Sequence, residues 1–168
     1  MVGATSGTGA LGGLVGSLVG ESIAATQNNI FKGSNKQYFQ AVKSNMPDLD
    51  KPIYTSLRQS IKGDSFFGSR LRESSTNTFT SRVTSYGLAR SGKADDGNLL
   101  LTPRIAIDLR LKDSEGKTLA GRTYIGTGYN HPITTYASNA AETSKGFKMA
   151  IQVAIDQFYA ELAQKTKE

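Results

Sequence analysis

The segment LTPRIAIDLRLKDSEGKTLAGRTYIGTG, residues 101–128, consists of an alternating apolar and polar run, a polar turn and a second run rich in strand-forming residues. Its first half places apolar residues at every second position: Ile105, Ile107, Leu109 and Leu111. A period of two is typical of a β-strand with one buried face and one solvated face. The run DSEGK, residues 113–117, has turn-forming composition, and residues 118–128 read as a returning strand. The segment therefore predicts a long β-hairpin.

The residues after the hairpin change to a helical period. Asn139 and Glu142 are spaced like a helix N-terminal cap. Apolar residues then recur about every four positions: Phe147, Ile151, Ala154, Phe158 and Leu162. This pattern predicts an amphipathic C-terminal helix that lies on the apolar face of the hairpin.

Upstream of the hairpin, residues 34–45 predict a short helix and residues 48–63 a second amphipathic helix. Asp48 or Asp50 is the expected N-cap of the second helix, and Gly63 the expected end. Residues 66–72 and 77–90 are rich in Phe, Thr, Val and Tyr, which favours strands. The expected fold is α+β: a largely antiparallel sheet with a long β-hairpin, packed by two amphipathic helices, plus an N-terminal glycine-rich helix.

The N-terminal stretch GALGGLVGSLVGESIAA, residues 9–25, carries a series of small residues at every fourth position: Gly12, Gly16, Gly20 and Ala24. Glycine is about 1 kcal/mol worse than alanine in a helix interior, so the series needs a compensating contact. On a helix these residues form one flat side that lets another backbone approach closely. The apolar residues expected to supply contact area are Leu14, Val15, Leu18 and Val19.

Other interpretations of this stretch fit less well. A dinucleotide-binding turn needs a strand before Gly3, and only Met1 and Val2 precede it. A signal peptide needs a basic leading segment, and the first basic residue is Lys32. The apolar run of residues 7–20 is shorter than the roughly 20 residues of a membrane span. We expect a short inserted, interfacial or subunit-packed helix, with a flexible glycine-rich tail as the alternative.

Two regions follow from these patterns. Residues 1–30 form a glycine-zipper-like helix and linker, and residues 31–168 form the α+β domain. The chain has 168 residues and no cysteine, which excludes disulfides and thiolate sites. Its net charge of +6 suggests attraction to polyanions or anionic lipid, with an ordinary solvated surface of mixed charges as the alternative.

The sequence motifs predict no catalytic, cofactor-binding or metal-binding residue. Residues 87–94, GLARSGKA, match most of a phosphate-loop pattern, but Ala94 replaces the magnesium-binding Ser or Thr. A strand ending in a polar loop explains them better. His131, the single histidine, is expected in an exposed loop. Glu142 and Asp156 are interpreted as a capping residue and a solvated helix position.

Five basic residues suggest one alternative function: Arg82, Arg104, Arg110, Lys112 and Arg122. Several of them could share the polar face of the sheet, with Tyr86 or Tyr124 among them. Basic side chains interleaved with aromatic rings bind single-stranded nucleic acid. A basic nucleic-acid-binding module is therefore the alternative to be weighed.

The order of helix, strand, hairpin with a D-x-x-G-K-x-L-A-type turn and closing helix, over residues 53–163, resembles small periplasmic lipoproteins of Gram-negative bacteria. The resemblance extends to auxiliary components of transport and secretion systems. It implies a non-enzymatic structural or docking subunit of an oligomeric envelope assembly, in the periplasm and associated with the outer membrane. The expected partners are copies of the chain and other envelope subunits, with membrane contact through the N-terminal segment. The lipidated cysteine of that group is not present in this sequence.

Overall fold

The computed structural model describes residues 30–64 and 76–165 of the chain. The elements in chain order are the 3-10 helix η1 (Gly33–Tyr38), α2 (Phe39–Ser44), α3 (Asp50–Gly63), β1 (Thr78–Lys93), β2 (Leu99–Lys112), β3 (Thr118–Thr127), β4 (His131–Pro132), α4 (Ile133–Ser138) and α5 (Ala140–Lys165). The predicted α+β class and the predicted hairpin are confirmed. The glycine-rich N-terminal helix and the strand expected at residues 66–72 lie outside the described residues.

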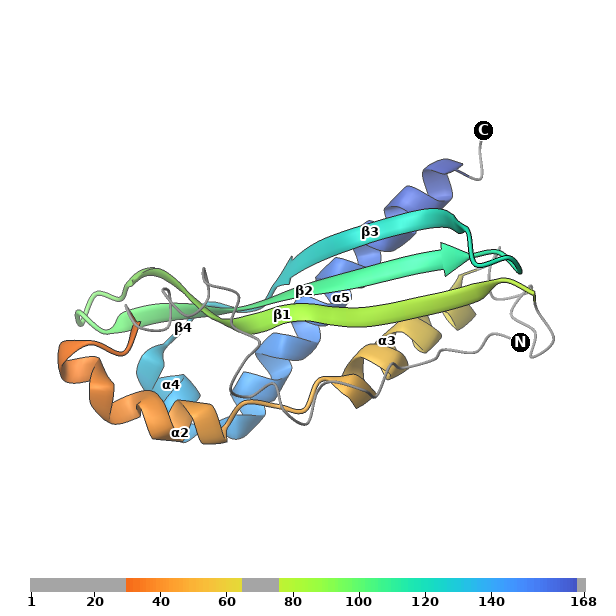
Figure 1. Ribbon diagram of the computed structural model, residues 1–168. Helices are drawn as coiled ribbons and strands as arrows, with labels where there is room; N and C mark the ends of the chain where they lie inside the picture. Colours follow the sequence, from red (N-terminus) through yellow and green to blue (C-terminus); the bar gives the residue numbers. More distant parts are fainter. Residues whose placement is uncertain (1–29, 65–75, 166–168) are drawn as a thin grey trace.

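β2 is the central strand of an antiparallel sheet, between β1 and β3 (Figure 1). β1 pairs with β2 along the whole of both strands, with Arg82 opposite Asp108. β3 pairs with the second half of β2, where Thr123 faces the same Asp108. β4 pairs with the first part of β2, with His131 opposite Leu101. The apolar residues that alternate along β2 therefore lie in the middle of the sheet.

The hairpin turn between β2 and β3 is built around Asp113. Its Oδ1 accepts hydrogen bonds from the backbone N–H of Glu115 at 3.0 Å and of Lys117 at 2.9 Å. Gly116 adopts a φ of 82°, which a residue without a Cβ adopts at little cost. Local side-chain and backbone chemistry thus closes the turn at the position that the sequence predicts.

α5 lies across the apolar face of β2 and β3. The five residues of its predicted apolar face are all buried: Phe147, Ile151, Ala154, Phe158 and Leu162. Its N-cap is Asn139, whose Oδ1 accepts a hydrogen bond from the backbone N–H of Glu142 at 3.1 Å. The predicted cap and the predicted apolar face are both confirmed.

Replacing Asn139 with alanine removes the side-chain acceptor from this cap. We expect the free energy of unfolding to fall by about 1 kcal/mol, because an N–H of the first turn of α5 loses its partner. Urea denaturation measures the change. Asn139→Asp, which keeps an acceptor oxygen, serves as the control and should remain close to the native stability. Equal losses in both variants would contradict a capping role.

Two glycines at the end of β3 allow α5 to approach the sheet very closely. A Cβ built on Gly126 would lie 1.7 Å from the carbonyl oxygen of Ala150, and one on Gly128 would lie 2.1 Å from that of Gly146. Real Cβ atoms do not come this close to a backbone oxygen, so the strand and helix backbones touch only because these side chains are absent.

α3 is amphipathic as predicted and buries Ile53, Leu57 and Ile61. It packs beside α5 and ends at Gly63. Its predicted cap is wrong. The N-cap position is occupied by Leu49, which makes no side-chain hydrogen bond there, so the helix begins one residue after an apolar side chain that is itself buried.

The first predicted helix divides into the 3-10 helix η1 and the α-helix α2, which ends at Ser44. Asn45 follows it and donates hydrogen bonds from Nδ2 to the carbonyl oxygens of Tyr136 and Ala137, both at 2.9 Å. These carbonyls belong to α4, a short helix that the sequence pattern did not predict. Asn45 thereby ties α2 to a segment about ninety residues away.

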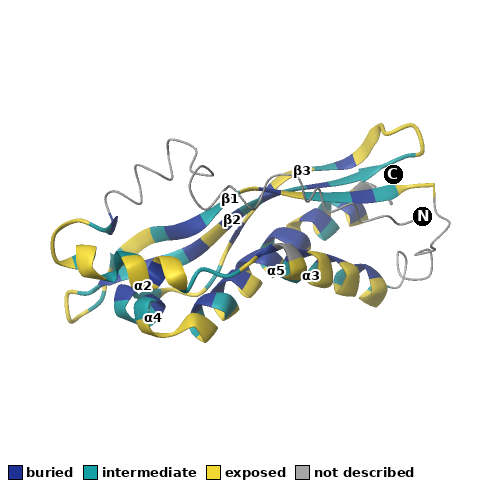
Figure 2. Ribbon diagram, turned by 60° about the horizontal axis from the view of Figure 1, so that its bottom comes forward, coloured by how far each residue is buried: buried dark blue, intermediate teal, exposed yellow. Residues whose placement is uncertain are grey.

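The core lies between the sheet and the helices. Buried residues occupy the sides where α5 and the strands face each other, and exposed residues occupy the outer turns of α2 and α3 (Figure 2). Burial of about 25 cal/mol per Å² of apolar surface makes this layer the main source of stability. The opposite face of the sheet carries no helix among the described residues.

Candidate interaction surface

The interaction residues expected from the sequence all fall in residues 1–29: Gly12, Leu14, Val15, Gly16, Leu18, Val19, Gly20 and Ala24. They lie outside the described residues. The close-contact role of this series, and the boundary at residue 30, therefore stay predictions.

The surface that the structure does describe is the solvated side of the sheet, which we call the open face. Its charged residues are Arg82 on β1 and Arg104, Asp108, Arg110 and Lys112 on β2. Burial of Ile105, Ile107 and Leu109 on the other side fixes which way these side chains point, because successive side chains alternate between faces.

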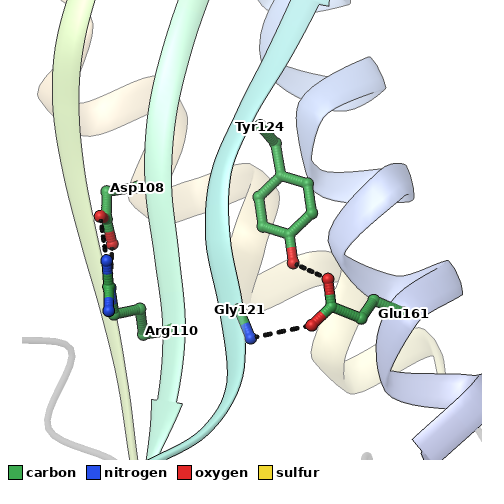
Figure 3. A network of polar contacts seen from close by, with 5 residues as sticks. All are labelled: Asp108, Arg110, Gly121, Tyr124 and Glu161. Carbon is green, nitrogen blue, oxygen red and sulfur yellow. Dashed lines mark hydrogen bonds and ion pairs between the residues drawn. The ribbon is translucent and has the colours of Figure 1, made fainter.

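Asp108 and Arg110 form a two-pronged ion pair on the open face. Arg110 Nε lies 2.6 Å from Asp108 Oδ1, and Nη2 lies 2.8 Å from Oδ2 (Figure 3). These hydrogen bonds from Arg110 are the largest cause that lowers the pKa of Asp108. Burial raises it, and the charges of Arg110, Arg82 and Lys112 lower it further. The pair holds the Arg110 guanidinium in a fixed orientation, because both prongs of its fork are engaged.

Arg110→Gln should raise the pKa of Asp108 toward its ordinary value of 3.8, because the charged donor is lost. In the native chain, the depressed pKa contributes stability above the unfolded-state value, and that contribution disappears as pH falls through the folded-state pKa. Carbon-13 NMR of the Asp108 carboxyl group during an acid titration measures the midpoint.

Arg90→Gln removes an exposed cation from the far part of β1 and is the matched control for this titration. It should leave the Asp108 midpoint unchanged. An Asp108 midpoint that is the same in Arg110→Gln and in the native chain would show that the ion pair does not form in solution.

The aromatic residues proposed to share the open face lie on the other side of the sheet. The Tyr86 ring packs 5.9 Å from Phe147, and the Tyr124 ring packs 5.6 Å from Phe158. Arg122 also belongs to that side, since its guanidinium lies 5.6 Å from the Tyr124 ring. The hypothesis of basic residues interleaved with these two tyrosines is therefore wrong, and the stacking surface that the nucleic-acid alternative required is not formed by them.

A polar network joins α5 to the outer edge of β3. Glu161 accepts hydrogen bonds from the backbone N–H of Gly121 at 3.1 Å and from the Tyr124 hydroxyl at 2.8 Å, with Arg122 Nε at 3.5 Å. Burial raises the pKa of Tyr124, and the bond to Glu161 raises it further. Gln157 adds a hydrogen bond at 3.0 Å from Nε2 to the carbonyl oxygen of Ile125.

These α5 side chains satisfy backbone groups that an edge strand otherwise leaves open to another chain. No sequence motif marks Glu161 or Gln157 as functional residues. Their only local signal is a helical position beside the apolar face. The strand group that Glu161 contacts is 40 residues away, and the one that Gln157 contacts is 32 residues away.

His131 is half-buried in β4, so its expected place in an exposed loop is wrong. Its Nε2 lies 3.7 Å from Glu142 Oε2, and its ring lies 5.8 Å from that of Tyr136. Lys145 lies 3.8 Å from the same carboxylate. The Glu142 carboxylate thus joins β4 to the first turn of α5. Its predicted role as a capping residue is not found, because the backbone N–H of Asn139 donates to the carbonyl oxygen of Thr135.

The two other carboxylates considered in the sequence, Asp96 and Asp156, accept hydrogen bonds from neighbouring residues. Asp96 accepts hydrogen bonds from the backbone and side chain of Asn98, and Asp156 accepts one from Gln152. Over residues 30–64 and 76–165, no three His, Cys, Asp or Glu side chains are grouped to hold a metal ion. Within the same ranges, no helix has the length and apolar character needed to cross a membrane.

Comparison with known proteins adds a likeness of fold. Neither a protein-family model nor a curated protein matches the sequence. Among solved structures, a minor lipoprotein from Acinetobacter baumannii matches with a TM-score of 0.50 and 14% identity, over 72% of this chain and 90% of that chain. A candidate lipoprotein from Caulobacter crescentus matches with a TM-score of 0.49 and 18% identity, over 70% of this chain and 82% of that chain.

At 14% identity the likeness concerns the fold alone. The architecture that the sequence resemblance implied is thus found in a lipoprotein of a Gram-negative bacterium.

Proposed function

We propose that the protein is a non-enzymatic structural or docking subunit of a bacterial envelope assembly, located in the periplasm and associated with the outer membrane. The observation that carries the proposal is the one-sided fold: helices cover one face of the sheet, and the described residues leave a charged open face on the other. The lipoprotein that shares this fold supports the envelope location.

The surroundings of the ionisable side chains support a non-enzymatic role. Asp108 is paired with Arg110, Glu161 binds Gly121 and Tyr124, and His131 stands beside Glu142. Each of these carboxylates has a partner within the fold. The folded domain then serves as a docking module, and the glycine series of residues 12–24 serves as the contact for copies of the chain or for neighbouring subunits.

Gly16→Leu tests the assembly role, because leucine would fill the flat side of the proposed helix. We expect light scattering of the full chain to fall from an oligomeric mass toward the monomer mass of 18.0 kDa. Membrane fractionation of cells that express the native chain tests the location. Recovery in the cytosolic fraction would overturn the envelope assignment.

Gly7→Leu is the matched control, since at about 100° per residue Gly7 falls on the side of the helix opposite Gly16. It introduces the same side chain without filling the contact face and should keep the native assembly size. If Gly16→Leu assembles as the native chain does, the glycine series has no role in assembly.

A further inference from the structure

The open face carries an excess of positive charge over a long, shallow surface. Its described charged residues comprise four cations and one carboxylate, and the carboxylate, Asp108, is held by Arg110. Arg104 and Lys112 stand eight residues apart on β2, which places their Cα atoms about 27 Å apart at the rise of a strand. Arg82 on β1 pairs with Asp108, which lies midway between these two residues. The cations are therefore distributed along a strip rather than converging on one point.

An apolar side chain lies within this strip. Ile125 on β3 pairs with Ala106 on β2, between Arg104 and Asp108, and is 44% exposed. Arginine and lysine also present aliphatic stems beneath their charged ends. The strip thus combines spread cations with one exposed apolar side chain, a combination that suits the boundary of lipid headgroups and acyl chains.

From this juxtaposition we propose that the open face binds an anionic phospholipid surface, with Arg82 and Arg104 contacting headgroup phosphates. The proposal deepens the proposed function, on which it rests for the presence of a membrane nearby. A bilayer presents many separate phosphates in one plane, and separate cations on a shallow sheet face complement that arrangement. Arg110 is left out of the contact pair because Asp108 engages its guanidinium.

Vesicle co-sedimentation of the full chain tests the proposal. One set of vesicles is phosphatidylcholine alone, and the other contains about one third phosphatidylglycerol. The double variant Arg82→Gln/Arg104→Gln should bind the anionic vesicles about 30-fold more weakly than the native chain, since each cation near such a surface contributes about a fivefold gain. Binding of the native chain should also weaken as salt is added.

Lys51→Gln/Lys148→Gln is the matched control. It removes the same charge from exposed positions on α3 and α5, in the helical layer. Its binding should change less than threefold. Thermal melting of both double variants confirms that each is folded, which is expected because the four side chains are exposed.

Each outcome decides the question. A loss specific to the open-face variant supports the proposal. An equal loss in both variants would show that net charge alone drives binding, and an absence of extra binding to anionic vesicles would overturn the proposal. Native binding to polyglutamate that exceeds binding to anionic vesicles would overturn it in favour of an acidic protein partner. Binding to vesicles of phosphatidylcholine alone that is the same for the native chain and both variants would be assigned to the N-terminal segment. That result tests the proposed function and not the lipid contact of the open face.

Discussion

Replacing Gly126 with alanine should lower the free energy of unfolding by about 3 kcal/mol or more, although it adds a single methyl group. The new Cβ would stand 1.7 Å from the carbonyl oxygen of Ala150 and 3.0 Å from the backbone nitrogen of Ala154. Both neighbours are backbone atoms of α5, so no side-chain rotation relieves the contact. The helix must move away from β3, and the packing of its buried face must loosen with it.

Gly63→Ala is the matched control for this substitution. It makes the same change at the end of α3, where a Cβ would meet nothing within 4 Å. Its effect should be neutral or slightly stabilising, because alanine reduces the conformational freedom of the unfolded chain. Urea denaturation of the two variants gives the comparison. Similar stabilities for Gly126→Ala and Gly63→Ala would mean that strand and helix are not in backbone contact.

The elements that the sequence predicts well are those whose pattern is local. The hairpin follows from the strict alternation around Ile107 and the turn at Asp113, and α5 follows from a helical repeat with Asn139 at its start. α4 and β4 escaped prediction because they share eight residues beginning at His131, too few to establish a period. Their pairing depends on Leu101 and on Asn45, which lie far away in the chain.

The charged residues of the open face were predicted in part. The placement of Arg122 among them was wrong, for a physical reason. Arg104, Arg110 and Lys112 alternate with buried residues of β2, so their shared face follows from the sequence. Arg122 was grouped with them, yet it stands two residues from Tyr124 and must share the face of that side chain. Once Tyr124 is buried against Phe158, Arg122 turns toward α5.

No local sequence pattern predicts the close contacts between α5 and β3. In the sequence Gly126 is an ordinary strand residue. Only the position of α5 along β3 places the backbone of Ala150 against it. Glu161 likewise resembles an ordinary surface residue, and the same position of α5 brings its carboxylate to the backbone N–H of Gly121. Both contacts depend on how the helix is positioned along the strand, which is decided by the whole buried layer.

Phe158→Ala should lower the free energy of unfolding by about 3–5 kcal/mol, because it empties the position where three elements meet. The Phe158 ring is fully buried, with its centroid 6.0 Å from Phe79 on β1 and 5.6 Å from Tyr124 on β3. Its edge-on arrangement with Phe79 adds to the area that it buries. Truncation leaves a cavity between the sheet and α5, which the rigid strands are unable to close.

Met149→Ala, on the same helix, provides the control, since the Met149 side chain is 38% exposed and alanine is a good helix former. Its stability should stay within about 0.5 kcal/mol of the native chain. Phe158→Leu should fall between the two, because leucine refills part of the cavity. A Phe158→Ala loss no larger than that of Met149→Ala would mean that α5 does not pack on the sheet through this residue.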